Sequence, residues 1–186
     1  MGYIACICEG GAERAILDLL LDNHKLIFER EDLIEEEILR CRSGKEFEKR
    51  YLRKGFADQI TIYRILDSRS EKFNLSKAYE PKVDVKNVIT APEIEKLIIC
   101  TEGKTTDYER ESRKNPQLKP SIYCKAFLKY SDVKRYDFVT KYFSDMEVLL
   151  KALHEYRRVS KIRTNEMTIW DLLKDNTDIG KRNKEK

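Results

Sequence analysis

Two glutamates near the start of this chain have the surroundings of a cation site. Glu9 comes directly after an apolar run, residues 3–8, and the pair Gly10-Gly11 follows it. Glu13 lies at the start of the amphipathic segment that comes next. If the run is a strand and the segment a helix, both carboxylates lie beyond the carboxyl end of a strand, where open α/β sheets bind ligands. A helix start stabilised by an acidic first turn explains the same residues without any ligand.

Three further acids follow later apolar segments in the same way. They are Asp67, after residues 60–66, and Glu93 and Glu95, after residues 83–90. Because parallel strands bring their carboxyl ends to one edge of a sheet, we expect these acids to converge with the first pair. Convergent carboxylates suit Mg²⁺ or Mn²⁺, and such an ion can activate water and stabilise charge on a phosphoryl group. A turn closing the strand, or a favourable helix start, accounts for these three residues as well.

The periodicity of the apolar residues predicts an α/β fold, with a mostly parallel, Rossmann-like sheet flanked by helices and a helical C-terminal portion. The segment 102–118 is polar and is expected to be a loop. The expected strands are 3–8, 25–28, 60–66 and 83–90. The expected helices are 11–22, two stretches within 33–54, 93–99 with Pro92 at its first turn, 119–130, 136–143, 145–159 and 167–174.

The composition indicates a globular protein of 186 residues, with 41% hydrophobic and 38% charged residues. No apolar run approaches the roughly 18 residues of a membrane span, so no membrane association is expected. The first fifteen residues lack the basic region of a signal peptide, and the expected location is the cytoplasm. We expect an α/β core over 1–100, a helical extension over 101–175 and a flexible basic tail over 176–186.

The five cysteines do not have the spacing of a zinc site, because no CxxC pair occurs and the two histidines are isolated. Cys6 and Cys8 lie two apart on a predicted strand, so both are expected to face the core. The net charge of +4 is small, and most of it lies in the tail. The interleaved basic and aromatic residues of 104–135 fit a nucleic-acid groove or an ordinary charged surface over an aromatic core.

Three short motifs resemble the toprim family. The segment from Cys8 to Glu13 resembles its EGxxE signature, and Asp67-Ser68-Arg69 lies where the family has a DxD motif. Residues 90–99 resemble the Asn-Pro-x-Phe-Glu-x-Trp segment of RloB-like and OLD-type toprim proteins, which occur in prokaryotic defence loci. Together these motifs extend over roughly residues 3–100.

The resemblance implies a toprim-like fold and Mg²⁺-dependent cleavage of phosphodiester bonds in DNA or RNA, with a role in phage defence. Glu9 would be a metal ligand and the general acid or base. Asp67 and Glu95 would be further metal ligands, and Glu13 and Glu93 supporting acids. A nucleic acid and a partner protein are the partners that such a role implies.

The sequence departs from these motifs at the second position of DxD, where Arg69 replaces an acid. Arginine cannot bind a cation, so either metal binding is weakened to one ion or Arg69 contacts a phosphate. In the third motif, Ile94 and Lys96 replace the expected aromatic residues. Three hypotheses therefore stand. The first is a metal-dependent nuclease, and the second is a catalytically weakened module that binds a partner protein, a nucleic acid or a nucleotide. The third is a structural or regulatory protein without a site.

Overall fold

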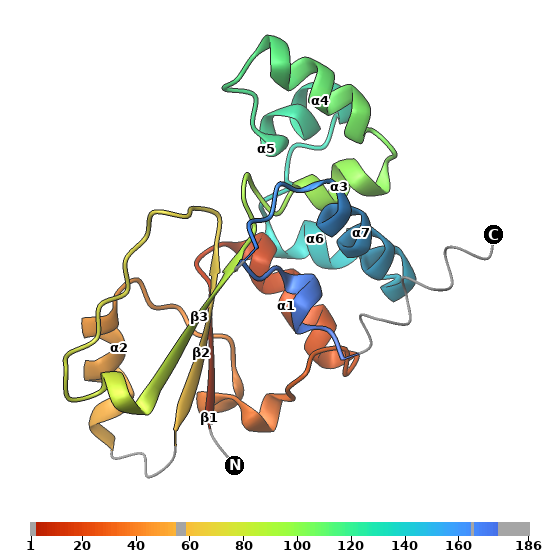
Figure 1. The fold of residues 1–186 in the computed structure, drawn as a ribbon. Helices are drawn as coiled ribbons and strands as arrows, with labels where there is room; N and C mark the ends of the chain where they lie inside the picture. The colour runs from red at the N-terminus through yellow and green to blue at the C-terminus, as the bar shows by residue number, and fades with distance from the viewer. Residues whose placement is uncertain (1–2, 55–58, 165, 175–186) are drawn as a thin grey trace.

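A parallel sheet of three strands, in the order β1-β2-β3, organises the structure. The structure is a computed structural model that describes residues 3–54, 59–164 and 166–174. The strands are β1 (Tyr3–Ile7), β2 (Ile60–Leu66) and β3 (Val83–Ile89), and Figure 1 shows them side by side with their carboxyl ends together. The predicted α/β class with a parallel, Rossmann-like sheet is therefore confirmed.

Both faces of the sheet are buried, because side chains alternate between two hydrophobic cores. Ala5 and Ile7 pack on one face, with Ile62 of the neighbouring strand and with Phe47 of helix α2 (Gly44–Arg50). Cys6 and Cys8 face the opposite side, as the spacing predicts. Helix α1 (Gly11–Asp22) covers that second face, together with α3 (Lys96–Thr101) (Figure 1).

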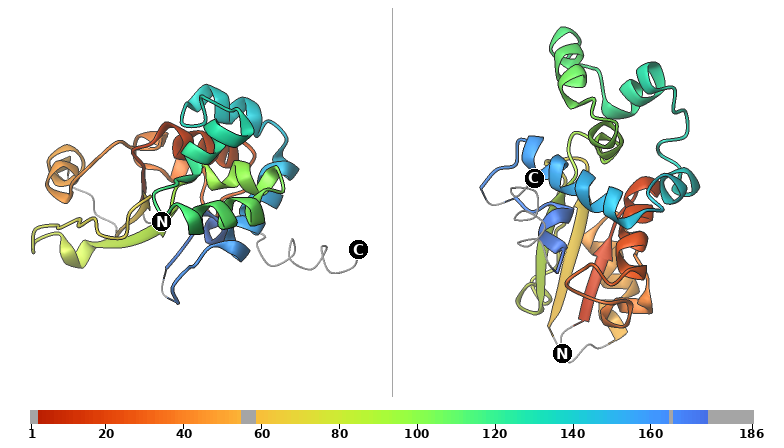
Figure 2. Two further views of the ribbon diagram at one scale, coloured as in Figure 1. Left: turned by 90° about the horizontal axis from the view of Figure 1, so that it is seen from above. Right: turned by 90° about the vertical axis from the view of Figure 1, so that its right-hand side faces the viewer.

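The C-terminal half is helical and contributes to the second core. Helix α6 (Tyr136–Tyr142) packs on α1, and α7 (Met146–Val159) packs on α3. Helices α4 (Thr105–Lys114) and α5 (Pro120–Tyr123), the latter continued by a π-helical turn Cys124–Leu128, extend away beyond the carboxyl ends of the strands, as the right-hand view of Figure 2 also shows. No helix among the described residues is long and apolar enough to span a membrane.

Two predictions for the segment between α1 and α2 are wrong. Residues 25–28 make only a single bridge, between Leu26 and Leu173, instead of a strand. Residues 33–39 contain a short 3₁₀ turn followed by extended chain, instead of a helix. The reason is that the free edge of β1 needs partners: Leu39 donates its N–H to the carbonyl of Cys6 at 2.7 Å and accepts from the N–H of Cys8 at 3.1 Å.

Helix α3 begins later than predicted. A cis peptide joins Ala91 to Pro92, so Pro92 precedes the helix instead of lying in its first turn. Residues 93–95 form tight turns in which each carbonyl accepts from the N–H three residues on, as between Glu93 and Lys96 at 3.2 Å. The α-helix begins only at Lys96.

Two further predictions fail in the C-terminal half. Helix α4 occupies residues predicted as a loop: its ion pairs across one turn, such as Lys104–Asp107 at 3.3 Å, support a polar helix. Residues 167–174 contain only a 3₁₀ turn, Ile169–Leu172, because the preceding Met167 pairs with the edge of β3 through Ile89. The predicted basic tail, 176–186, lies outside the described residues.

Replacing Ile62 by alanine should lower the free energy of unfolding by about 2–5 kcal/mol, because its fully buried side chain would leave a cavity in the first core. Urea denaturation followed by circular dichroism measures the change. The matched control is Thr61→Ala on the same strand, where the side chain is half-buried and the loss should stay below about 1 kcal/mol. Equal losses in the two variants would contradict the two-faced packing described above.

Candidate functional site

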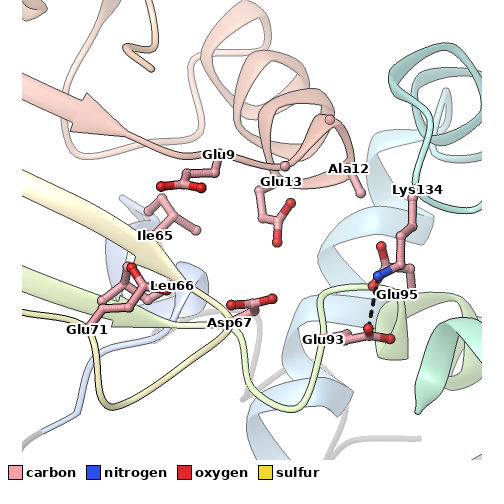
Figure 3. A pocket seen from close by; sticks show the side chains of 12 residues that line it. Glu9, Ala12, Glu13, Ile65, Leu66, Asp67, Glu71, Glu93, Glu95 and Lys134 are labelled. Carbon is pink, nitrogen blue, oxygen red and sulfur yellow. Dashed lines mark hydrogen bonds and ion pairs between the residues drawn. The ribbon is translucent and has the colours of Figure 1, made fainter. Parts of the chain in front are cut away.

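The five predicted acids gather around one pocket at the carboxyl ends of the strands. The pocket has a volume of about 240 Å³. In Figure 3 the glutamates of the β1–α1 turn lie on one side, and the pair that precedes α3 lies across the opening. The acids that line it are Glu9, Glu13, Asp67, Glu71, Glu93 and Glu95. Lys134 is the single basic residue of this lining. We call this the acidic pocket.

The two glycines after β1 allow neighbouring groups to approach the backbone closely. Gly10 has an ordinary extended backbone, with φ −83°, but a Cβ there would lie 1.8 Å from Oε2 of Glu13. The missing side chain thus lets the Glu13 carboxylate fold back over the start of α1. A Cβ on Gly11 would lie 3.0 Å from the carbonyl oxygen of Lys134. Gly11 therefore lets the loop that carries Lys134 pack against α1.

Glu9 and Asp67 form the open side of the pocket. Asp67 is solvent-exposed and directly follows β2. The Glu9 side chain is half-exposed and makes an ion pair with Arg42, whose Nε lies 3.4 Å from its Oε2. Arg40 donates to the backbone carbonyl of Glu9 at 3.0 Å, which holds the turn in place. Both carboxylates are accessible to a ligand entering from solvent, as is Glu71 of the same lining, which pairs with Arg64 at 3.5 Å.

Glu93 is buried and has two fixed partners. Its Oε1 lies 2.9 Å from Nζ of Lys134, and its Oε2 accepts from the N–H of Ser121 at 3.0 Å. Burial by itself would raise the pKa of Glu93, but the hydrogen bonds from Ser121 and Lys134 outweigh it and hold the pKa below its usual value. Glu93 is therefore ionised and acts as the anchor for Lys134.

Glu95 and Glu13 are the carboxylates with the least compensation. Burial, reinforced by the charges of Glu13 and Glu93, raises the pKa of Glu95 to about 7. Burial also raises the pKa of Glu13, and the charges of Asp67 and Glu93 add to the effect. Lys134 opposes both shifts. The pocket thus holds more negative charge than its one lysine offsets.

Arg69 does not line the acidic pocket. Its guanidinium turns toward Glu166, with Nε 2.6 Å from Oε1, and donates from Nη2 to the carbonyl of Lys161 at 3.1 Å. The predicted interference of this arginine with cation binding is therefore absent from the pocket. Lys134, in contrast, is a site residue that the sequence motifs do not indicate, because it lies in the loop before α6 and reaches the pocket only through tertiary packing.

The chemistry of the donor set fits a hard divalent cation, because carboxylate oxygens are the ligands that Mg²⁺ and Mn²⁺ prefer. As they stand, however, no three acidic, histidine or cysteine side chains within residues 3–54, 59–164 and 166–174 are grouped so as to hold a metal ion. The raised pKa values of Glu13 and Glu95 show that added positive charge would be favourable here. Cation binding therefore requires the carboxylates to move closer together.

Comparison with known proteins gives no match: no protein-family model, no curated protein and no solved structure matches this chain.

The raised pKa of Glu95 predicts that stability falls as pH rises from about 4.5 toward 7 and above. A group with a raised folded-state pKa stabilises the fold below its unfolded pKa and loses that contribution as pH passes the folded value. The loss for Glu95 is on the order of 2–3 kcal/mol. Glu95→Gln removes this titration, so urea denaturation at pH 5 and pH 8 should show a smaller decrease than in the wild type.

The control for this measurement is Glu147→Gln, an exposed change on α7, which should leave the pH dependence unchanged. Glu93 does not contribute to the change in stability between pH 5 and pH 8, since its lowered pKa places its titration below this pH range. An equal decrease in wild type and Glu95→Gln would contradict the raised pKa.

Replacing Lys134 by methionine should raise the pKa of Glu93 and of Glu95, because the lysine charge lowers both. Titration of the side-chain carboxyl ¹³C resonances by NMR measures both values directly. Lys141→Met, at an exposed position of α6 outside the pocket, should leave them unchanged. Unaltered values in Lys134→Met would mean that the lysine does not act on these carboxylates.

Proposed function

We propose that this protein is a toprim-like, Mg²⁺- or Mn²⁺-dependent nuclease that cleaves phosphodiester bonds of DNA or RNA. The observation that carries the proposal is the convergence of Glu9, Asp67 and Glu95, from three separate strand ends, on one pocket. Each of these residues belongs to a different motif of the toprim resemblance. A role in phage defence, acting with a partner protein, is part of the same proposal.

Glu9 and Asp67 are the proposed cation ligands at the mouth of the pocket, and Glu95 is the third, at its buried side. When bound, the cation would polarise a phosphoryl oxygen and assist the attack of water. Glu13 supports this set from the start of α1, and Gly10 leaves it the space to do so. Bringing these carboxylates together costs Coulomb repulsion, which the divalent charge would offset.

Lys134 supplies the positive charge that a phosphate substrate needs next to a cluster of carboxylates. Its ammonium group, held by Glu93, lines the pocket, and the side chain is 60% exposed. An exposed ammonium at this position can contact a non-bridging phosphate oxygen. Lys134 is thus the proposed substrate-positioning residue, and Glu93 fixes its orientation.

The second hypothesis, a catalytically weakened binding module, was based on Arg69. An arginine among the metal ligands would repel a cation. Arg69 instead pairs with Glu166 and lies outside the acidic pocket. The alternative therefore lacks the contact that favoured it, and the nuclease is the better-supported proposal.

Glu9→Gln and Asp67→Asn should each reduce Mn²⁺-dependent cleavage by about 100-fold or more, a loss in the range that general acid–base groups contribute. The assay incubates single- and double-stranded DNA and RNA with the protein and Mg²⁺ or Mn²⁺. Calorimetric titration with Mn²⁺ reports cation binding separately, and both variants should bind the ion more weakly.

Glu147→Gln is the matched control, because it removes an equivalent charge from an exposed position of α7 and should keep full activity. Cleavage that survives in Glu9→Gln would come from another source and would contradict the proposal. Wild-type protein that neither binds Mn²⁺ nor cleaves any of the four substrates would contradict it as well.

A further inference from the structure

A second pocket lies beside the acidic pocket and has the opposite charge. Its volume is about 430 Å³, and two chain segments, 67–71 and 91–96, contribute residues to the linings of both pockets. Four basic side chains and one carboxylate line it: Arg69, Lys96, Arg113, Lys161 and Glu109. We call it the basic pocket.

Lys96 is the most unusual residue of this lining, because it is a buried cation without a carboxylate partner. It is 6% exposed. Its Nζ donates to the carbonyl of Val159 at 3.4 Å and lies 6.0 Å from the centre of the Tyr156 ring. Among the described residues, no carboxylate lies within ion-pair distance of this ammonium. Burying an unpaired charge is costly, and burial accordingly lowers the pKa of Lys96.

Ser160 adds a hydroxyl group to the same pocket. Its Oγ is buried and makes no hydrogen bond of acceptable geometry in the described part of the chain. The Tyr156 hydroxyl interacts with it but donates its own proton to the carbonyl of Ala91 at 2.9 Å. Buried hydroxyl groups normally find a partner, since an unmade hydrogen bond costs about 1–3 kcal/mol. A ligand that accepts hydrogen bonds would satisfy the Ser160 hydroxyl and the Lys96 ammonium together.

Arg113 and Lys161 extend the positive charge to the mouth of the pocket. Both are exposed, and neither side chain makes an ion pair with another described residue. Arg69 is held at the wall by Glu166. The pocket therefore combines exposed cations at its opening with a buried donor pair inside, which is the order in which an anion would meet them on entry.

We propose that the basic pocket binds a phosphate group, with Lys96 and Ser160 as its buried donors. A phosphate carries several acceptor oxygens on one compact anion, so it can accept from both donors and from the exposed cations at the same time. A carboxylate offers fewer acceptors and less charge for a pocket lined by four basic side chains. The phosphate can belong to a free nucleotide or to the backbone of a nucleic acid.

The basic pocket lies beside the acidic one, so a single nucleic-acid strand could reach both pockets. Arg69 lies two residues after Asp67, and Lys96 directly follows Glu95. A strand with one phosphate in the basic pocket would place a neighbouring part of its backbone near the acids. Binding of phosphate does not depend on cleavage, so the inference stands independently of the proposed nuclease activity.

The test measures binding in EDTA, which excludes any contribution from a metal ion. The probes are inorganic pyrophosphate, ATP and a fluorescein-labelled single-stranded oligonucleotide, studied by calorimetry and fluorescence anisotropy. Lys96→Met, which keeps the length of the side chain, should weaken binding at least 10-fold. Ser160→Ala should weaken it about threefold. Neither variant should lower the melting temperature, because each removes a buried polar group without a strong partner.

Lys141→Met is the matched control, since it removes an exposed lysine of α6 that lines neither pocket, and it should change affinity less than twofold. Glu147→Gln, an exposed change on α7 that lines neither pocket, should bind as the wild type does, and the absence of metal in EDTA separates this inference from the nuclease proposal. Binding of pyrophosphate or ATP identifies a free phosphate ligand, and binding of the oligonucleotide alone identifies a backbone phosphate; both support the pocket. No binding of any probe, or equal losses in Lys96→Met and Lys141→Met, would overturn it.

Discussion

The parallel register of the three strands is the constraint on which the rest of this structure depends. Ile7 of β1 lies opposite Arg64 of β2, which in turn lies opposite Asn87 of β3. Chains leaving three strands in such a register all emerge at one edge, so acids that follow them are brought together although they are far apart in sequence. The same register lets both faces of the sheet be covered, which makes this edge the accessible part of the strands.

The acidic pocket is a compromise between burial and charge. Glu93 has two donors and is ionised, whereas Glu95 and Glu13 are buried near other negative charges and hold their protons more tightly. Lys134 offsets only part of this excess. An arrangement of this kind is less stable than an apolar one would be, and strained electrostatics of this type are concentrated at functional sites. This excess of negative charge is the physical basis of the proposal that the pocket binds a cation.

One short segment separates the acidic pocket from the basic pocket. Residues 91–96 present Glu93 and Glu95 to one side and Lys96 to the other. A phosphate chain needs cations along its backbone, and a metal-dependent site needs carboxylates at the reacting bond. Both requirements are met within one edge of the sheet, because helix α3 starts at that point and turns successive side chains in different directions.

The sequence by itself determined the three strands of the sheet, the helix after β1 and five of the six acids of the pocket. Those follow from periodicity and from acids placed directly after apolar runs, which are local signals. The extended path of 33–39 and of Met167 depended on the edges of β1 and β3, so local patterns predicted those segments wrongly. The helix at Thr105–Lys114 was missed for a different reason, because its support comes from ion pairs within one turn and not from an apolar face. Only the tertiary structure turned Arg69 toward Glu166, brought Lys134 to Glu93, and left Lys96 buried without a carboxylate. These contacts join residues far apart in the sequence, and no spacing rule connects them.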